Sequence, residues 1–341
     1  MTRYLAIDNV CAWPNLTPMP DRRIIATIFN RPAHGTLPGD IECWESRDEG
    51  RFWHRCGVPA PHEPSTNRMN VAVGLARDGA LIVIASGYRS AALRHNKPAL
   101  VIPDDSFQPL PAWVCRSTDG GCTWTRTATF PPPRGTKHIT PFGKIVQAPD
   151  GTLAVAGYAR GTVKNTYQSH FYRSHDDGRT WQAVKLIGPR HSETDLLHLG
   201  GNQWLAAARM FAEERLDLFR SNDGGRSWKL TGPLTGRYQH PAHLLRLADG
   251  RILLSYGIRQ RGFYGLGALV GAKDGQTWLQ PLVLLDLDDT TDGGYPSTVQ
   301  LADGSLLTAY YANGVKGHAR YHMGVIRWNL DEQLELNRFK Y

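Results

Sequence analysis

An octapeptide of the form S-x-D-x-G-x-S/T-W recurs along the chain and constrains its fold more than any other feature. Complete copies occupy residues 117–124, 174–181 and 221–228, a near match occupies 46–53, and a shortened copy occupies 272–278. The Asp side chain can accept backbone N–H groups of its own turn, the Gly can adopt a positive φ, and the Ser or Thr hydroxyl can join the ends of the turn. The closing Trp is expected to be buried between neighbouring sheets. This recurrence predicts an architecture of structural repeats.

A second series of turns lies between the octapeptides, and each turn precedes an apolar strand. The turns begin at Asp21, Asp78, Asp150, Gly200, Asp249 and Asp303. A short strand, a hairpin, a second strand, a loop, a third strand, an octapeptide turn and a fourth strand together form one four-stranded antiparallel blade.

The sequence therefore predicts an all-β protein, a six-bladed β-propeller that occupies residues 1–341 as a single domain. The second blade is longer, with an insertion expected around residues 91–111. The last blade has no octapeptide, and its outer strand is expected to come from one terminus or the other.

The formal net charge of +8 raises the question of a nucleic-acid partner, but the chain has no run of five basic residues and no basic helix. We expect neither a nucleic-acid nor a membrane partner, because no apolar run reaches the ~18 residues of a membrane span. No signal peptide is visible, so we expect a cytoplasmic protein, or a secreted or periplasmic one if a signal has been removed. The 5 cysteines have no metal-ligand spacing, and we expect neither a metal nor a cofactor.

Octapeptide turns of this kind on a six-bladed propeller resemble the Asp boxes, or BNR repeats, of the sialidase (neuraminidase) superfamily. The resemblance covers essentially the whole chain. In that superfamily the boxes are structural and lie on the outer rim, so the site has to be argued from other residues.

Arginines recur at a fixed distance after the hairpin turns. Arg31, Arg160 and Arg259 follow the first turn residue by ten positions, Arg209 by nine and Arg89 by eleven. Each could be a solvated surface residue. Together they favour a cationic opening at one end of the propeller, and since guanidinium groups bind carboxylates in a bidentate manner, the expected ligand is an anionic sugar.

The starts of the inner strands carry two further candidates. Tyr295 lies in a segment that resembles the one in which sialidases carry their tyrosine nucleophile, and Glu193 is similar to the glutamate that polarises this tyrosine. A neighbouring carboxylate can accept the proton of a phenol that would otherwise be a poor nucleophile. The resemblance implies that Arg209 and Arg259, or Arg261 in place of Arg259, bind the substrate carboxylate. The alternatives are a packed core tyrosine and a solvated acid.

The chain departs from the sialidase pattern in two places. The segment 11–16 has no arginine where sialidases carry the first of three carboxylate-binding arginines, and Arg31 or Arg68 could substitute for it. Trp13 in this segment and Asn67 beside Arg68 are expected to contact substrate. The acid/base residue is either Asp40 or His34, and both could instead be loop-forming residues.

Histidines also lie near the starts of inner strands: His62, His138, His240 and His243. Single histidines in such positions are often hydrogen-bonded loop residues, but several around one channel would suit proton transfer. We expect His138 and His240 to contact substrate.

Three hypotheses follow. The first is an exo-acting glycoside hydrolase, in which Tyr295 attacks the anomeric carbon of a terminal anionic, sialic-acid-like sugar and the configuration is retained. The second is a polysaccharide lyase acting on a glycan that contains uronic acid. The third is a carbohydrate-binding propeller without activity.

Overall fold

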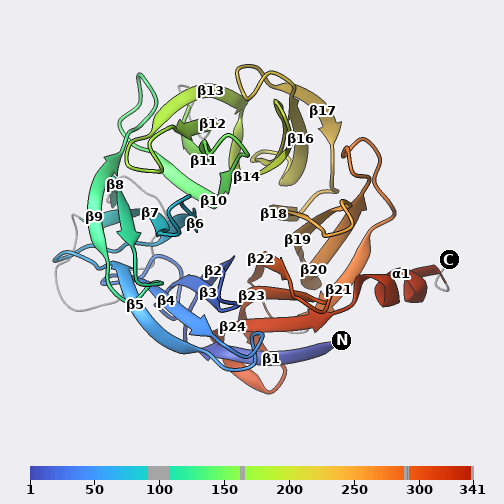
Figure 1. The fold of residues 1–341 in the computed structure, drawn as a ribbon. Coiled ribbons are helices and arrows are strands. Elements are labelled where there is room, and N and C mark those ends of the chain that lie inside the picture. The colour runs from blue at the N-terminus through green and yellow to red at the C-terminus, as the bar shows by residue number, and fades with distance from the viewer. Residues whose placement is uncertain (91–106, 162–165, 288–289, 291, 339–341) are drawn as a thin grey trace.

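The chain forms a six-bladed β-propeller in the computed structural model, which describes residues 1–90, 107–161, 166–287, 290 and 292–338 (Figure 1). The blades surround a central axis, and each blade runs from an inner to an outer strand. Most of the insertion expected at 91–111 lies outside the described residues, and its last five residues belong to β8 (Phe107–Ser117).

The strands of each blade follow one another along the chain. Blade 1 contains β2 (Ala12–Pro18), β3 (Ile24–Phe29), β4 (Ile41–Ser46) and β5 (His54–Ala60); blade 2 contains β6 (Asn70–Leu75), β7 (Leu81–Ser90), β8 and β9 (Thr125–Phe130). Blade 3 contains β10 (Thr140–Gln147), β11 (Leu153–Arg160), β12 (Tyr167–Ser174) and β13 (Gln182–Pro189); blade 4 contains β14 (His191–Gly200), β15 (Gln203–Met210), β16 (Arg215–Ser221) and β17 (Lys229–Pro233). Blade 5 contains β18 (Gln239–Arg246), β19 (Ile252–Gln260), β20 (Phe263–Gly271) and β21 (Leu282–Asp286).

The sequence left open which terminus supplies the outer strand of blade 6. This blade contains β22 (Gly293–Gln300), β23 (Leu306–Val315), β24 (His318–Trp328) and, as its outer strand, β1 (Thr2–Asp8) from the N-terminus. β1 pairs antiparallel with β24 from Thr2 opposite Arg327 to Asp8 opposite His322. The ring is thus closed by hydrogen bonds between the two ends of the chain, and the helix α1 (Leu330–Arg338) follows outside the ring (Figure 1).

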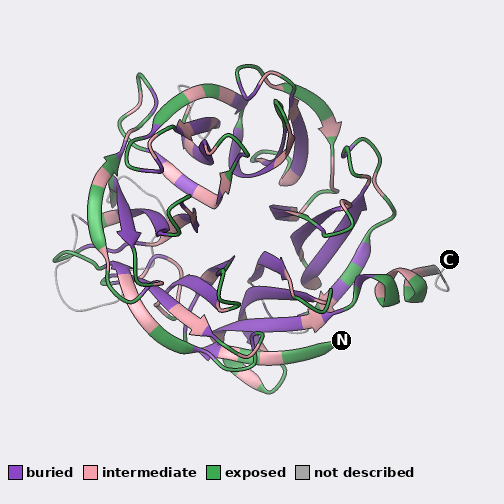
Figure 2. Ribbon diagram, viewed as in Figure 1, coloured by how far each residue is buried: buried purple, intermediate pink, exposed green. Residues whose placement is uncertain are grey.

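Neighbouring blades pack face to face through apolar side chains. Phe171 of blade 3 meets Trp204 of blade 4 edge to face, with ring centroids 5.3 Å apart. Buried residues dominate the inner strands and exposed residues mark the outer strands, as Figure 2 shows. β6 and β10 also pair in parallel at Gly143–Ala72 and Lys144–Val73, which joins blades 2 and 3 into one eight-stranded sheet. Within the described residues, no helix is long and apolar enough to cross a membrane.

The Asp-box turns have the hydrogen bonds that their sequence predicts. In blade 2, Asp119 accepts from Ser117 Oγ at 2.7 Å and from the Thr123 backbone N–H at 2.9 Å. The Gly121 N–H donates to Ser117 Oγ at 2.8 Å, and Trp124 Nε1 donates to the Gly121 carbonyl at the same distance. The shortened copy has Ala272 in place of Ser. Its turn has bonds from the Gly275 N–H to the Ala272 carbonyl, from the Ala272 N–H to the Thr277 carbonyl, and from the Gln276 N–H to Asp274.

We expect Asp176→Ala to lower the free energy of unfolding by about 1–2 kcal/mol, because the turn of blade 3 loses its acceptor. Asp176 accepts from Ser174 Oγ at 2.8 Å and from the N–H and Oγ1 of Thr180 at 2.8 and 2.6 Å. Urea unfolding measures the change. Asp176→Asn is the matched control, which keeps one carbonyl acceptor and should cost less. An unchanged midpoint in Asp176→Ala would show that the turn does not depend on this side chain.

Candidate active site

Four of the six inner strands share an irregularity near their first residues, at the end of the propeller where the candidate residues lie. The antiparallel register shifts between Ala12 and Asn15 in β2, and between His191 and Thr194 in β14. It also shifts between Gln239 and Ala242 in β18, and between Gly294 and Ser297 in β22. Such bulges redirect side chains away from the regular ladder. The residues inside these four bulges include Trp13, Glu193, His240 and Tyr295.

Strained backbone accompanies two of these bulges. Tyr295 has a φ of 51°, and Trp13 has a φ of 46°. Non-glycine residues rarely adopt this region, and residues held in it cluster at functional sites. Gly294, with a φ of 112°, precedes Tyr295, and an added Cβ there would lie 3.1 Å from the Gly257 Cα. The close approach of blades 5 and 6 thus requires glycine beside Tyr295.

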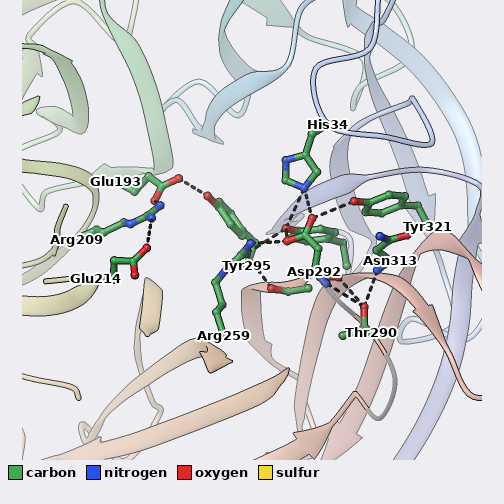
Figure 3. A network of polar contacts seen from close by, with 12 residues as sticks. His34, Glu193, Arg209, Glu214, Arg259, Thr290, Asp292, Tyr295, Asn313 and Tyr321 are labelled. Atoms are coloured by element: carbon green, nitrogen blue, oxygen red, sulfur yellow. Dashed lines mark hydrogen bonds and ion pairs between the residues drawn. The ribbon is translucent and has the colours of Figure 1, made fainter. Parts of the chain in front are cut away.

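Tyr295 of blade 6 and Glu193 of blade 4 point toward each other (Figure 3). The Tyr295 hydroxyl donates to Glu193 Oε1 in a short hydrogen bond, and Arg209 Nη1 donates to Glu193 Oε2 at 2.8 Å. Burial raises the pKa of Tyr295 well above its usual value, the charge of Glu193 raises it further, and the nearby arginines oppose the shift only in part. Tyr295 is therefore a neutral phenol at rest, and its proton already points at a carboxylate.

A second cluster is centred on Asp292. Arg259 Nη2 donates to Asp292 Oδ1 in a short ion pair, and its Nη1 lies 3.1 Å from the Tyr311 hydroxyl. The Tyr311 and Tyr321 hydroxyls donate to Asp292 at 2.8 and 3.1 Å, and His34 Nε2 makes a short contact with Oδ2. Burial opposes ionisation, but the His34 contact and the Arg259 charge lower the pKa of Asp292 below its usual range. Asp292 is thus a carboxylate that binds both an arginine and a histidine.

A cavity of about 850 Å³ opens beside these clusters, within the usual range for small-molecule sites. Tyr295 and His34 line it, and so do several aromatic residues that could stack on a sugar ring: Trp13, Tyr88, Phe142, Tyr158 and Tyr167. The ionisable side chains His138, His243, Arg134, Lys137 and Arg160 also line the cavity. Of the arginines predicted to converge here, only Arg160 lines this cavity; Arg209 and Arg259 lie beside Tyr295, with side chains 17% and 21% exposed.

The two substitutes considered for the missing first arginine lie elsewhere. Arg68 is 1% exposed, stacks on Trp113 at 3.6 Å and donates to the Pro111 carbonyl at 2.8 Å. Burial lowers its pKa to about 10. Arg31 is half-buried, does not line the cavity, and its carbonyl accepts from the Cys11 N–H. Trp13, in the segment that lacks the arginine, has its ring 4.8 Å from His34 and 6.3 Å from Tyr295.

The side chains of Asn67 and Asp40 form hydrogen bonds within the protein. Asn67 is fully buried, donates to the Gly35 carbonyl at 2.8 Å and accepts from the Tyr88 N–H at 2.9 Å, so it ties two loops together and does not line the cavity. Asp40 accepts from the backbone and the ring of His62 at 2.6 and 2.7 Å. Partial burial opposes ionisation, but these hydrogen bonds lower the pKa of Asp40. Neither Asp40 nor His62 lines the cavity.

The remaining histidines differ in their exposure. His138 is exposed on the cavity lining, and partial burial and the Lys137 charge lower its pKa. His243 is 6% exposed, accepts from the Thr298 N–H at 3.3 Å, and burial and Lys144 lower its pKa to about 3. His240 is 2% exposed, and burial, Arg209 and Arg259 lower its pKa to about 2. His240 and His243 are therefore neutral, and only His138 and His243 of these three line the cavity.

Among the described residues no group of three or more His, Cys, Asp or Glu side chains could hold a metal ion. Sequence reasoning missed Asp292, Tyr311 and Tyr321 as members of the site. Asp292 lies only three residues before Tyr295, and this proximity to the candidate nucleophile was the one available signal. Nothing in the sequence indicated that the tyrosines would face it.

A six-bladed propeller with Asp boxes is a sialidase-like fold, and this fold defines the class of the protein. The profile of the BNR repeat-like domain matches residues 39–308, and the chain belongs to that family. It is similar to a sialidase of Micromonospora viridifaciens, with 26% identity over 307 residues that cover 80% of this chain and 47% of that protein. The chain thus spans about half the length of this relative.

Solved structures confirm the fold. A protein of unknown function from Dyadobacter fermentans superposes with a TM-score of 0.83 at 22% identity, covering 96% of this chain and 98% of that chain. The NanB sialidase of Streptococcus pneumoniae superposes with a TM-score of 0.73 at 14% identity, covering 97% of this chain and 70% of that chain. Likeness at these identities shows the propeller alone, and the activity has to be proposed from the site.

Proposed function

We propose that this protein is an exo-acting glycoside hydrolase that cleaves an anionic glycan with retention of configuration. The observation that carries the proposal is the hydrogen bond from the Tyr295 hydroxyl to Glu193 at the edge of an aromatic-lined cavity. Retaining enzymes with a tyrosine nucleophile are a recognised exception to the two-carboxylate glycosidases. The similarity to a curated sialidase supports the same chemistry.

The first step forms a bond between Tyr295 Oη and the anomeric carbon while the bond to the leaving oxygen breaks. Glu193 accepts the phenol proton, and Arg209 stabilises the resulting pair by its contact with Glu193. In the second step a water molecule attacks the anomeric carbon. The Tyr295 oxygen then leaves and regains its proton from Glu193.

His34 is the residue that we assign to protonate the leaving oxygen and then to take a proton from the attacking water. It lines the cavity, its side chain is 34% exposed, and Asp292 holds its Nε2. Among the described residues its Nδ1 has no partner, so this nitrogen is available to substrate. Imidazole exchanges protons near neutral pH, whereas the lowered pKa of Asp40 makes that carboxyl a poor proton donor.

The expectation that Arg209 and Arg259 bind a substrate carboxylate is less favoured. Acids of the protein already bind both guanidinium groups: Glu193 lies 2.8 Å from Arg209, and Asp292 forms a short ion pair with Arg259. A substrate carboxylate beside Tyr295 would have to share a guanidinium with one of these acids. We therefore propose an anionic glycan as the substrate class. The proposal does not require that its negative charge lies next to the anomeric carbon.

A panel of aryl glycosides and oligosaccharides tests this function. It contains an aryl α-sialoside, aryl uronides, neutral aryl glycosides and uronic-acid oligosaccharides, with released aglycone as the readout. We expect release from at least one anionic glycoside and retention of configuration by NMR of the first product. Inversion, or binding of anionic glycans without any turnover, would contradict the proposal, and the second outcome would indicate a binding propeller.

A polysaccharide lyase is the second candidate, and the histidines on the cavity lining favour it. A lyase removes the proton next to a uronic-acid carboxylate, and His138, with its lowered pKa, lies beside the cation Lys137. The panel separates the two activities, because an unsaturated lyase product absorbs in the near ultraviolet and a hydrolysis product does not.

A further inference from the structure

Positive charge gathers on one edge of the cavity, across the axis from Tyr295. Arg134, Lys137 and Arg160 line the cavity from the loop before β10 and from the end of β11, and all three are exposed. These residues, here called the blade 3 edge, belong to the blade that faces blade 6 across the ring (Figure 1). Tyr295 lies on blade 6, so a ligand that reaches from Tyr295 to the blade 3 edge spans the cavity.

The three cations of the blade 3 edge have no ion pair with any described residue. Three other cations near the site do have such partners: Arg209 binds Glu193, Arg259 binds Asp292, and Lys144 binds Asp195. The part of the cavity lining that the structure describes contains no Asp or Glu. Within the described residues the positive charge of the lining is therefore uncompensated, and it lies at the blade 3 edge rather than at the arginines beside Tyr295.

This distribution matters for the position of the negative charge on a ligand. Charge in a concave site attracts opposite charge, and guanidinium groups that are free of partners bind carboxylate or sulfate oxygens in a bidentate manner. A guanidinium that is already bound to a protein carboxylate offers much less to a second anion. Three aromatic residues that line the same cavity, Tyr158, Tyr88 and Phe142, provide apolar faces for the sugar rings.

We infer that the blade 3 edge is a second subsite, which binds an anionic substituent, a carboxylate or a sulfate ester, on a sugar other than the one attacked by Tyr295. The substrate class is then an acidic oligosaccharide with its charge at a distance from the cleaved bond. The place of bond cleavage rests on the proposed function, whereas the binding of charge at this edge does not.

The experiment measures binding by isothermal titration calorimetry at low and physiological salt. Chondroitin sulfate oligosaccharides carry carboxylate and sulfate groups, hyaluronan oligosaccharides carry carboxylates alone, and chitin oligosaccharides carry neither. The test variant is Arg134→Gln/Lys137→Gln/Arg160→Gln. The matched control, Arg51→Gln/Arg226→Gln/Lys229→Gln, removes the same charge from exposed residues of two outer Asp-box turns and of the start of β17. Tyr295→Phe reports binding in the absence of turnover.

We expect the wild type, the control and Tyr295→Phe to bind at least one acidic oligosaccharide more tightly than the neutral one. The test variant should bind it at least about tenfold more weakly, with a smaller salt dependence. Preference for chondroitin sulfate over hyaluronan would assign the subsite to sulfate, and equal affinity would assign it to carboxylate. Far-UV circular dichroism and the single variant Arg160→Gln show whether a loss reflects folding.

Equal affinities of the test variant and the control would overturn the inference, as would binding of the neutral oligosaccharide as tightly as the acidic ones. Failure of the proposed function has a different signature. In that case acidic oligosaccharides bind, the test variant loses this binding, and no glycoside is turned over. Conversely, the test variant and the wild type could hydrolyse an acidic oligosaccharide with the same KM. This result would support the proposed function and reject the subsite.

Discussion

Tyr295→Phe is expected to lower kcat by at least about 10³-fold, because it removes the oxygen that forms the covalent bond to the sugar. The phenyl ring still fills the space of the phenol, so we expect binding of oligosaccharides and the fold to be retained. Glu193 then loses its hydrogen bond from the phenol but keeps Arg209 at 2.8 Å. The measurement is steady-state hydrolysis of the glycoside that the panel identifies.

Tyr310→Phe is the matched control for this substitution. Tyr310 lies next to Tyr311 in β23, is fully buried, and its hydroxyl accepts from Arg3 at 2.8 Å in blade 6, outside the candidate site. Removal of this hydroxyl should cost about 1 kcal/mol of stability and leave kcat unchanged. Full turnover in Tyr295→Phe would reject the mechanism, and equal losses in both variants would indicate a general disturbance of blade 6.

His34→Asn is expected to lower kcat by about 10²–10⁴-fold for a glycoside with a poor leaving group. For an aryl glycoside whose aglycone is strongly acidic the loss should be much smaller, because such a group departs without a proton. Arg259 keeps Asp292 as its partner, because their ion pair does not involve His34. The measurement is kcat for a series of aryl glycosides with aglycones of increasing pKa.

Asp40→Asn distinguishes the two acid/base candidates. Asp40 accepts hydrogen bonds from His62 and lies outside the cavity lining, so its replacement should disturb one loop and change kcat for all leaving groups alike. A dependence on the leaving group in Asp40→Asn, and its absence in His34→Asn, would transfer the acid/base role to Asp40.

The fold could be predicted from local sequence because each blade repeats its own turn chemistry. The Asp and hydroxyl side chains and the Gly backbone of each box make their contacts within eight residues, as the hydrogen bonds of Asp119 show. The strand that closes the ring could not be predicted in this way. Pairing of β1 with β24 joins residues more than 300 positions apart, and the pattern of either terminal segment suited an outer strand equally well.

The candidate site could be predicted only where a residue has a fixed place in the repeat. Tyr295 and Glu193 stand at comparable positions in their strands, and the structure brings them into contact. Arg68 could not be placed in this way, because a loop side chain can turn either to the axis or into a neighbouring blade, and Trp113 provides a stacking face there. Asp292 was missed for a related reason, since its importance depends on partners from blades 1, 5 and 6.

The pairing of Arg259 with Asp292 also could not be predicted from charge patterns. In sequence the two residues are 33 positions apart, and an arginine in register with others suggested a free guanidinium. The structure gives this arginine a partner within the protein and leaves Arg160, in register with it, without an ion pair among the described residues. An anionic ligand binds best where an arginine has no acidic partner in the protein, so the pairing of the arginines matters more than their number.

Trapping of the glycosyl–enzyme intermediate tests most directly whether Tyr295 is the nucleophile. The protein is mixed with the glycoside that the panel identifies, prepared with a fluorine next to the anomeric carbon and a reactive leaving group, and its intact mass is measured. We expect an added mass of one glycosyl unit that peptide fragmentation locates on Tyr295 and that is absent from Tyr295→Phe. Turnover of the same glycoside with no adduct, or with the adduct on another residue, would contradict the proposed mechanism.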